Sequence, residues 1–356
     1  MRTGLIALLA FVLGFAFAVG VYVAGTAWLM HGITSVQKPA AHVAQKPAAP
    51  TASPATNRKP LLAEAPPSLL PDQGWPHDAP TPEQVMVAQP DLLGRELAQL
   101  KPRTPGKVNL YAIVFAGDGG ENVFRNEAEY FDKLLAQRFH QAGHTVVLEN
   151  NPASLATRPL ADWSNLESAL DALAAKMDPR QDILMLYFTT HGSEDHTLLV
   201  DMDPLPLDQI GARDLPGILS EHPFQHKVVI VHACYSGGFI PPLRAPGTMV
   251  ITAARADRSS FGCGEQSQLT WFGHAFLVDA LNRTGDFVQA FQLARKEVSK
   301  WETRDGYTSS EPQIAIGAGI QTQLAAWAQQ NPPGAPVPFK AAPQPHSAAV
   351  PPPPQR

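Results

Sequence analysis

"KVVIVHACYSGGF", residues 227–239, sets a run of apolar residues directly before a cysteine and a pair of glycines. A run that is apolar at nearly every position predicts a strand buried on both faces, as in a parallel sheet covered by helices. The strand would end at Cys234, and Gly237 and Gly238 would allow a tight turn just past it. The stretch therefore predicts an α/β fold with a cysteine at the carboxyl end of one of its strands.

The segments on both sides of this stretch repeat one pattern, in which short apolar runs alternate with longer amphipathic ones. The pattern is typical of a mostly parallel sheet with helices on both faces, joined by right-handed crossovers. Helices are also expected at about residues 271–282 and 285–302, and a loop or short hairpin at 198–206. The expected strands are residues 108–117, 144–150, 182–190, 227–233, 247–254 and 312–317.

The beginning of the chain carries a long uncharged apolar segment, residues 4–30. As a helix it would reach roughly 40 Å, enough to cross a bilayer core. We expect residues 1–31 to be a cytoplasmic N-terminus and a signal anchor in the inner (cell) membrane, with the rest of the chain periplasmic or extracellular. The alternative is a cleaved signal peptide, because Ala16-Phe17-Ala18 resembles a cleavage site. The apolar run continues past Ala18, which favours the retained anchor.

Composition divides the remainder of the chain. The 35 prolines concentrate in two stretches, which predict a Pro/Ala-rich linker at residues 32–105 and a disordered tail at 332–356. Residues 106–331 are then expected to form one domain. A net charge of −5 and the lack of a lysine or arginine run give no basic face, so we expect no nucleic-acid partner. The sequence does not indicate an oligomeric state.

Two expected strands end in reactive side chains, His191 after residues 182–190 and Cys234 after residues 227–233. Parallel strands present their carboxyl ends at one edge of the sheet, where such folds bind ligands. A thiolate attacks carbonyl carbon readily, and an imidazole beside it activates the thiol or protonates the leaving group. The N–H groups of Gly192 and Cys234 would hold a developing oxyanion. We therefore expect a Cys-His pair with a nucleophilic role.

Other interpretations of these residues remain open at this point. Cys234 could be a buried structural thiol, and His191 a hydrogen-bonded core histidine. His232 is a second candidate base, because residues two apart in a strand share a face. A metal site would combine His191, His196, His232 and Cys234, but their spacing lacks the paired short repeats of zinc sites. We expect no metal and no organic cofactor.

Four sequence blocks resemble those of legumain-type (asparaginyl endopeptidase) cysteine peptidases of the caspase-like clan, in particular a bacterial membrane-anchored branch. They are "IVFAGDGGENVFRNEAEYF", "YFTTHGS", "VHACYSGGF" and "ITAARADRSSFGCGE", at residues 113–131, 187–193, 231–239 and 251–265. The resemblance implies a caspase-like α/β sandwich. It also implies Cys234 as nucleophile, His191 as acid/base and Gly192 in the oxyanion hole.

The resemblance extends to the substrate pocket with several departures. The positions that match pocket positions of the family are Arg125, Asn126, Tyr235, Ser259 and Ser260. Asn126 replaces a histidine, and Tyr235 follows the nucleophile where eukaryotic members carry a carboxylate. His274 stands where another acid is expected. Cleavage after asparagine is therefore not carried over by the resemblance.

The second cysteine, Cys263, lies in a loop that the family brings near the substrate pocket. In an oxidising compartment a reversible Cys234–Cys263 disulfide would act as an off-switch, and the alternative is an unpaired, buried Cys263. The expected function is a membrane-anchored cysteine endopeptidase that acts on protein or peptide substrates through an acyl-enzyme. Two alternatives are a transamidase that uses the same Cys-His pair and a non-catalytic interaction protein with a peptidase fold.

Overall fold

The computed structural model describes residues 75, 79–264 and 267–341, which all fall within one compact unit, Leu70–Arg356. The segment predicted to anchor the chain, residues 1–31, lies outside the described residues. Among the residues that are described, no helix is both long and apolar enough to span a bilayer.

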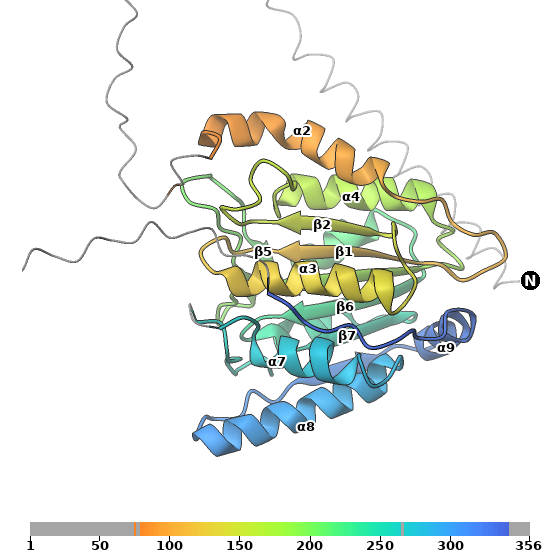
Figure 1. Ribbon diagram of the computed structural model, residues 1–356. Helices are drawn as coiled ribbons and strands as arrows, with labels where there is room; N and C mark the ends of the chain where they lie inside the picture. The colour runs from red at the N-terminus through yellow and green to blue at the C-terminus, as the bar shows by residue number, and fades with distance from the viewer. Residues whose placement is uncertain (1–74, 76–78, 265–266, 342–356) are drawn as a thin grey trace, which may run out of the picture. The chain divides into compact units, whose positions relative to one another are not determined.

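A six-stranded sheet forms the centre of the fold, in the order β2-β1-β3-β6-β7-β8 (Figure 1). Its strands are β1 (Leu110–Ala116), β2 (Thr145–Glu149), β3 (Ile183–Thr189), β6 (His226–His232), β7 (Thr248–Thr252) and β8 (Gln313–Ile316). The first five strands are parallel, and the edge strand β8 runs antiparallel to β7. Every residue of β1 and β3 is buried, which explains their continuous apolar runs. The mostly parallel sheet agrees with the predicted fold class.

Helices cover both faces of the sheet (Figure 1). One face carries α3 (Asn122–Gln137), α7 (Trp271–Gly273), the π-helical η2 (His274–Ala280), α8 (Phe287–Asp305) and α9 (Ile320–Gln330). The other carries α2 (Pro82–Ala98), α4 (Trp163–Lys176), α5 (Asp214–Ser220) and α6 (Ile240–Leu243). Successive strand residues enter opposite cores, as Val114 and Phe115 do. The hairpin of β4 (Thr197–Leu198) and β5 (Ile210–Gly211) falls in the region predicted as loop or hairpin.

Helix α2 lies inside the range predicted as linker, residues 32–105, and corrects the domain boundary. A capping box begins the helix: the Thr81 hydroxyl accepts from the Gln84 N–H, and the Gln84 side chain accepts from the Thr81 N–H. Val85 and Leu92 are buried, and the Glu96 carboxylate accepts from the Val147 N–H at 3.1 Å. Proline enrichment suggested a linker, but proline is compatible with a first helical turn. The described part of the folded unit therefore extends back to residue 79.

The first residues of the predicted disordered tail, 332–341, also pack on the unit. Val337 is only 4% exposed, and its carbonyl accepts from the Tyr130 hydroxyl at 2.8 Å. Phe339 lies edge-on to the Tyr130 ring at 5.3 Å. These contacts bury two apolar side chains that composition alone assigns to a tail, while residues 342–356 lie outside the described part.

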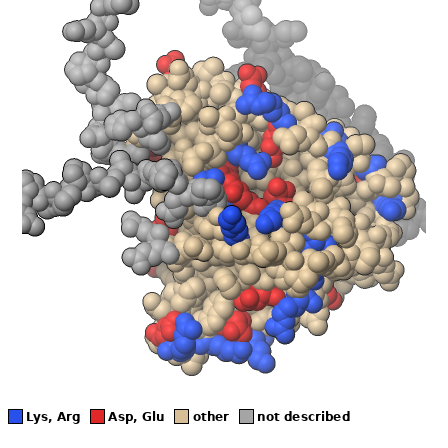
Figure 2. Space-filling model, in the orientation of Figure 1, with Lys and Arg blue, Asp and Glu red and all other residues tan. Residues whose placement is uncertain are grey.

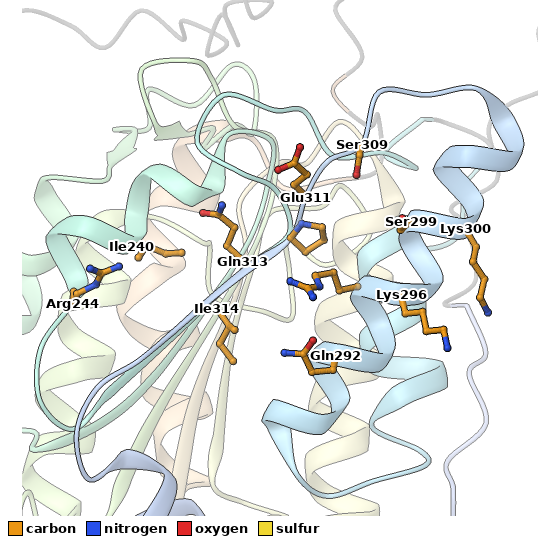
Figure 3. Close-up of a pocket in the computed structure, with 12 residues that line it drawn as sticks. Ile240, Arg244, Gln292, Lys296, Ser299, Lys300, Ser309, Glu311, Gln313 and Ile314 are labelled. Atoms are coloured by element: carbon orange, nitrogen blue, oxygen red, sulfur yellow. The ribbon is translucent and has the colours of Figure 1, made fainter.

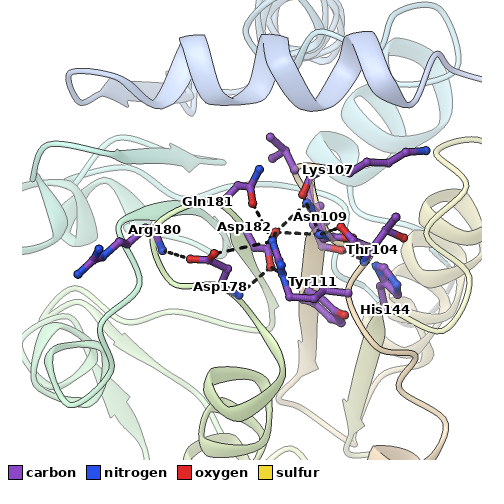
Figure 4. Close-up of polar contacts among 12 residues, drawn as sticks. Thr104, Lys107, Asn109, Tyr111, His144, Asp178, Arg180, Gln181 and Asp182 are labelled. Carbon is purple, nitrogen blue, oxygen red and sulfur yellow. Dashed lines mark hydrogen bonds and ion pairs between the residues drawn. The ribbon is translucent and has the colours of Figure 1, made fainter.

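A polar network fixes the amino ends of β1 and β3 (Figure 4). The buried Asp182 carboxylate accepts from the Asn109 N–H at 2.9 Å, the Asp178 N–H at 2.8 Å and Arg103 Nε at 2.9 Å. Burial opposes ionisation of Asp182, but the Arg103 and Asn109 hydrogen bonds outweigh it and lower its pKa. The network lies at the amino edge of the sheet, and the reactive side chains follow the strands at the opposite, carboxyl edge.

Candidate active site

The two reactive residues follow neighbouring strands at the carboxyl edge of the sheet. Thr189 of β3 pairs with His232 of β6, and the Thr190 N–H donates to the His232 carbonyl just beyond. The backbone at Gly192 lies directly against Cys234, since a Cβ at Gly192 would sit 2.2 Å from the Cys234 carbonyl oxygen. Only glycine fits this approach. The His191 side chain is 34% exposed and Cys234 is partly exposed, so neither is sealed under a helix.

Two carboxylates face the His191 ring. Its Nε2 lies 3.4 Å from Asp118 Oδ2 and 3.6 Å from Glu121 Oε2, and Phe124 packs edge-on at 5.1 Å. The other Asp118 oxygen accepts from the Gly120 N–H at 2.8 Å, which fixes the carboxylate. Sequence reasoning assigned no role to Asp118. The signal was an acid directly after the buried strand β1, at the same edge of the sheet as His191.

The loop at residues 253–264 and 267–270 packs on the cysteine. The Ser260 N–H donates to Cys234 Sγ at 3.2 Å, and the Ser260 hydroxyl lies 3.5 Å from the sulfur. Gly237 permits the close approach, because a Cβ there would sit 2.5 Å from the Ala256 nitrogen. The structure thus places the predicted pocket residue Ser260 in contact with the sulfur.

Tyr235 takes a left-handed conformation, with φ at 55°. Its N–H donates to the Arg258 carbonyl at 2.7 Å, which ties the cysteine to the same loop. Its hydroxyl lies 3.3 Å from a Glu194 carboxylate oxygen and 3.5 Å from the Ser259 hydroxyl. Tyr235 and Ser259 are therefore gathered beside Cys234, as the resemblance implied.

His232 is not available as the base. It is 1% exposed, and its Nδ1 lies 2.8 Å from Glu127 Oε2 while its Nε2 lies 2.6 Å from the Thr270 hydroxyl. Both ring nitrogens are engaged beneath α3, on the helix side of the sheet. The alternative metal set that includes His196 is not assembled either: within residues 79–264 and 267–341, no cluster of three His, Cys, Asp or Glu side chains could hold a metal ion.

Arg125, on α3, makes its ion pairs with two glutamates. Its Nε pairs with Glu129 at 2.8 Å and lies 3.6 Å from Glu149, at the end of β2. In the sheet, β1 and β3 lie between β2 and β6, the strand that leads to Cys234. Asn126 donates to the Gln268 carbonyl at 2.9 Å and so holds the loop at residues 253–264 and 267–270, the pocket loop, on α3.

His274 takes part in contacts of its own helix. Its Nδ1 lies 3.2 Å from Asp279 Oδ2, and its ring packs edge-on to Trp301 at 5.7 Å. With 45% of its side chain exposed, it lies on the surface of η2. These contacts do not join it to the described residues around Cys234.

Replacing Glu149 by glutamine is expected to remove part of the pH dependence of stability. Burial raises the pKa of Glu149 to about 7, although the charges of Arg125 and Arg158 oppose the shift. The unfolded carboxyl titrates near 4.5, so the folded protein holds the extra proton between these values. The free energy of unfolding should therefore fall as pH rises through this window, by up to about 3 kcal/mol. Urea unfolding of wild type and Glu149→Gln at pH 5 and pH 8 measures this change. The same change in the free energy of unfolding for the two proteins would contradict the prediction.

Cys263 is unpaired, as is Cys234. Burial raises the pKa of the Cys263 thiol to about 11, and the negative potential of Cys234 and Glu121 adds to the effect. Cys263 therefore stays protonated at neutral pH and is a poor nucleophile. This leaves the disulfide switch without a pre-formed bond and agrees with the alternative of an unpaired, partly buried thiol.

Comparison with solved structures returns caspases at low identity. Caspase-1 from Spodoptera frugiperda is 14% identical with a TM-score of 0.43, and the alignment covers 62% of this chain and 94% of that chain. The structure of pro-sf-caspase-1 is 13% identical with a TM-score of 0.44, covering 59% of this chain and 88% of that chain. A search of curated proteins found no match.

The model of the Peptidase C13 family matches residues 167–323, which include His191, Cys234 and the pocket loop. The match covers less than half of the chain and begins after β1 and α3, so the resemblance of residues 113–131 lies outside it. The blocks around the two reactive residues lie inside it, in the expected order. The resemblance to a cysteine peptidase family is thereby confirmed at residues 167–323, which match the Peptidase C13 family, a family of cysteine peptidases.

Proposed function

We propose that the chain is a membrane-anchored cysteine endopeptidase in which Cys234 is the nucleophile and His191 the general acid and base. The observation that carries the proposal is the packing of Gly192 against Cys234, which puts both reactive residues on adjoining strand ends. Both side chains are open to solvent, so a peptide can reach them. The family match supplies the reaction class.

The reaction follows from these positions. The Cys234 thiol gives its proton to His191, and the resulting thiolate attacks the peptide carbonyl carbon, so that the S–C bond forms and the carbonyl oxygen takes the negative charge. His191 then gives that proton to the leaving amine as the C–N bond breaks, which leaves a thioester. Water, deprotonated by His191, hydrolyses the thioester and regenerates the thiol.

The negative oxygen of the intermediate needs donors close to the sulfur. The bridge between Gly192 and Leu198 uses the N–H groups of Ser193 and Leu199, at 3.1 and 3.0 Å from their acceptors. The Gly192 N–H takes no part in that bridge, and it lies next to the Cys234 backbone. Together with the Cys234 N–H it is the donor pair that we assign to the oxyanion.

Replacing Asp118 by asparagine is expected to lower kcat about 10- to 100-fold with little change in KM, because the carboxylate orients His191 and stabilises its charged form. The distance of 3.4 Å between Asp118 Oδ2 and His191 Nε2 supports this role. Steady-state kinetics measure the change, with Asp195→Asn as the control. Asp195 is an exposed carboxylate four residues after His191, and it accepts from the Ser193 hydroxyl. Equal kinetics of wild type and Asp118→Asn would contradict the role.

A peptide-library digest tests the function as a whole. Wild type should release cleaved peptides that Cys234→Ser does not, and the cleavage sites would report specificity at the same time. Adding an amine nucleophile separates hydrolysis from transamidation, since a transamidase would yield amine adducts seen by mass spectrometry. Intact peptides with both proteins would refute the peptidase proposal and favour the non-catalytic interaction protein.

The anchor is part of the same proposal. The uncharged run at residues 4–30 and the single Arg2 before it support a cytoplasmic N-terminus and an exported domain. Membrane fractionation should find the full chain with the inner membrane and a chain without residues 1–31 in the soluble fraction. Recovery of the full chain in the soluble fraction would refute the anchor.

A further inference from the structure

A second surface feature lies away from Cys234, along the open edge of the sheet. It is a groove of about 990 Å³, which we call the β8 groove (Figure 3). The chain of β8 runs between Arg244, which follows α6, and the side chains of α8. The lining residues are Ile240, Arg244, Gln292, Arg295, Lys296, Ser299, Lys300, Ser309, Glu311, Pro312, Gln313 and Ile314. None of them belongs to the proposed catalytic site.

The β8 groove carries an excess of positive charge. Its one carboxylate, Glu311, is already paired with Arg255 at 2.6 Å, and Lys300 pairs with Glu297 at 2.7 Å. Arg244, Arg295 and Lys296 have no carboxylate within ion-pair distance among the described residues. Basic and acidic side chains gather along α8 at the lower edge of Figure 2. Three unpaired cations on one groove favour an anionic occupant.

The floor of the groove offers backbone hydrogen bonds. Among the described residues β8 pairs with β7 alone, and no described strand lies along its other side. The Gly317 N–H donates to the Thr248 carbonyl at 2.8 Å. Because an antiparallel ladder alternates, Ala315 and Gln313 also bond toward β7, and the N–H and C=O groups of Ile314 and Ile316 point to the open edge. An extended chain laid along β8 would pair with those groups.

We propose that the β8 groove binds an acidic, extended segment of another polypeptide, which adds to the sheet beside β8. Its carboxylates meet Arg244, Arg295 and Lys296, and its backbone pairs with Ile314 and Ile316. A lipid headgroup would match the charge but would leave the strand edge unused, which is why a peptide is the better fit.

The β8 groove lies beside the loop at residues 253–264 and 267–270, which contacts Cys234. The Arg255 N–H donates to the Ser310 carbonyl at 2.8 Å, beside the Arg255–Glu311 ion pair. Arg255 begins the stretch that leads to Ser259 and Ser260 next to Cys234. A segment bound in the β8 groove therefore lies next to the loop that contacts the cysteine.

Fluorescence polarisation with the full-length Cys234→Ala protein tests the proposal without any need for catalysis. The probe is a short labelled peptide in which glutamate alternates with valine, and the matched probe has glutamine in place of glutamate. We expect the glutamate probe to bind about tenfold or more tightly than the glutamine probe and to weaken with added salt. Equal binding of the two probes, or none, would overturn the proposal.

Variants locate the binding site. The double variant Arg295→Gln and Lys296→Gln should weaken binding of the glutamate probe about tenfold or more, while Arg180→Gln should not change it. Arg180 is an exposed cation just before β3, a strand that β6 and β7 separate from β8. A glutamate probe with N-methyl groups on alternate residues should bind poorly, and unchanged binding would refute strand addition. A vesicle test separates a lipid from a peptide. If the protein binds phosphatidylcholine vesicles that contain phosphatidylserine but not the glutamate probe, and the double variant weakens vesicle binding, the groove binds lipid and the proposal is overturned.

Discussion

Replacing Cys234 by alanine is expected to reduce peptide-bond cleavage about 10⁴-fold or more, because the acyl-enzyme route is lost with the sulfur. No neighbouring group can take its place. The hydroxyl of Ser260, 3.5 Å from the sulfur, is a weaker nucleophile than a thiol at neutral pH, and the Cys263 thiol is held protonated by its raised pKa of about 11. Initial rates on peptides selected from the library digest measure the effect.

The two cysteines of the chain provide an internal control for that experiment. A peptide carrying a thiol-reactive electrophile should label Cys234 in the wild type at neutral pH, whereas Cys263 should stay unlabelled. Peptide mapping by mass spectrometry reads both positions in one sample. Residual cleavage by Cys234→Ala above a tenth of the wild-type rate, or labelling at Cys263 alone, would contradict the assignment of the nucleophile.

Replacing Glu127 by alanine is expected to lower the free energy of unfolding by about 3–5 kcal/mol. The carboxylate is fully buried, and its Oε2 accepts from the Tyr187 hydroxyl at 3.0 Å and pairs with His232 at 2.8 Å. Its Oε1 accepts from the Thr270 N–H at 2.8 Å. Alanine would leave the buried Thr270 N–H without its acceptor and would remove the carboxylate from Tyr187 and His232, which costs more than the loss of one surface ion pair.

Urea unfolding monitored by tryptophan fluorescence measures this loss. Glu129→Ala is the matched control, because Glu129 lies on the same helix, is one-third exposed and pairs with Arg125, so it should cost about 1 kcal/mol or less. Burial favours the neutral form of Glu127, but the His232 charge and the hydrogen bonds from His232 and Thr270 prevail and lower its pKa. The pair therefore stabilises the fold above the ordinary carboxyl pKa and loses that effect as pH falls. Equal costs for the two variants would contradict the network.

Patterns that are local in the chain were enough to predict the strands and the edge that holds the reactive residues. β1, β3 and β6 are continuous apolar runs, so their existence and burial follow from hydrophobicity alone. The neighbouring placement of His191 and Cys234 follows in turn, because parallel strands end at one edge. The position of His232 beneath α3 could only be left open, since a strand pattern does not say which face a polar residue enters.

Contacts between distant parts of the chain explain what could not be predicted. Arg125 matches a pocket position of the family, and its contact with Glu149 on β2 could not be predicted because it depends on how α3 packs on the sheet. Helix α2 was not predicted, because its proline-rich surroundings were interpreted as a linker. The signals for a helix were a capping box and four buried positions at helical spacing, Val85, Gln89, Leu92 and Glu96. Asp118 has a recognisable position after a strand, yet its contact with His191 depends on β1 and β3 being neighbours.

The positive φ of Tyr235 decides which side chains can stand next to Cys234. Aspartate and asparagine enter such backbone far more readily than β-branched residues, so a carboxylate could replace the phenol at low cost. The bond from the N–H of residue 235 to the Arg258 carbonyl belongs to the main chain and would survive the exchange. The surface beside the thiol can thus change its chemistry while the turn that presents the thiol keeps its shape.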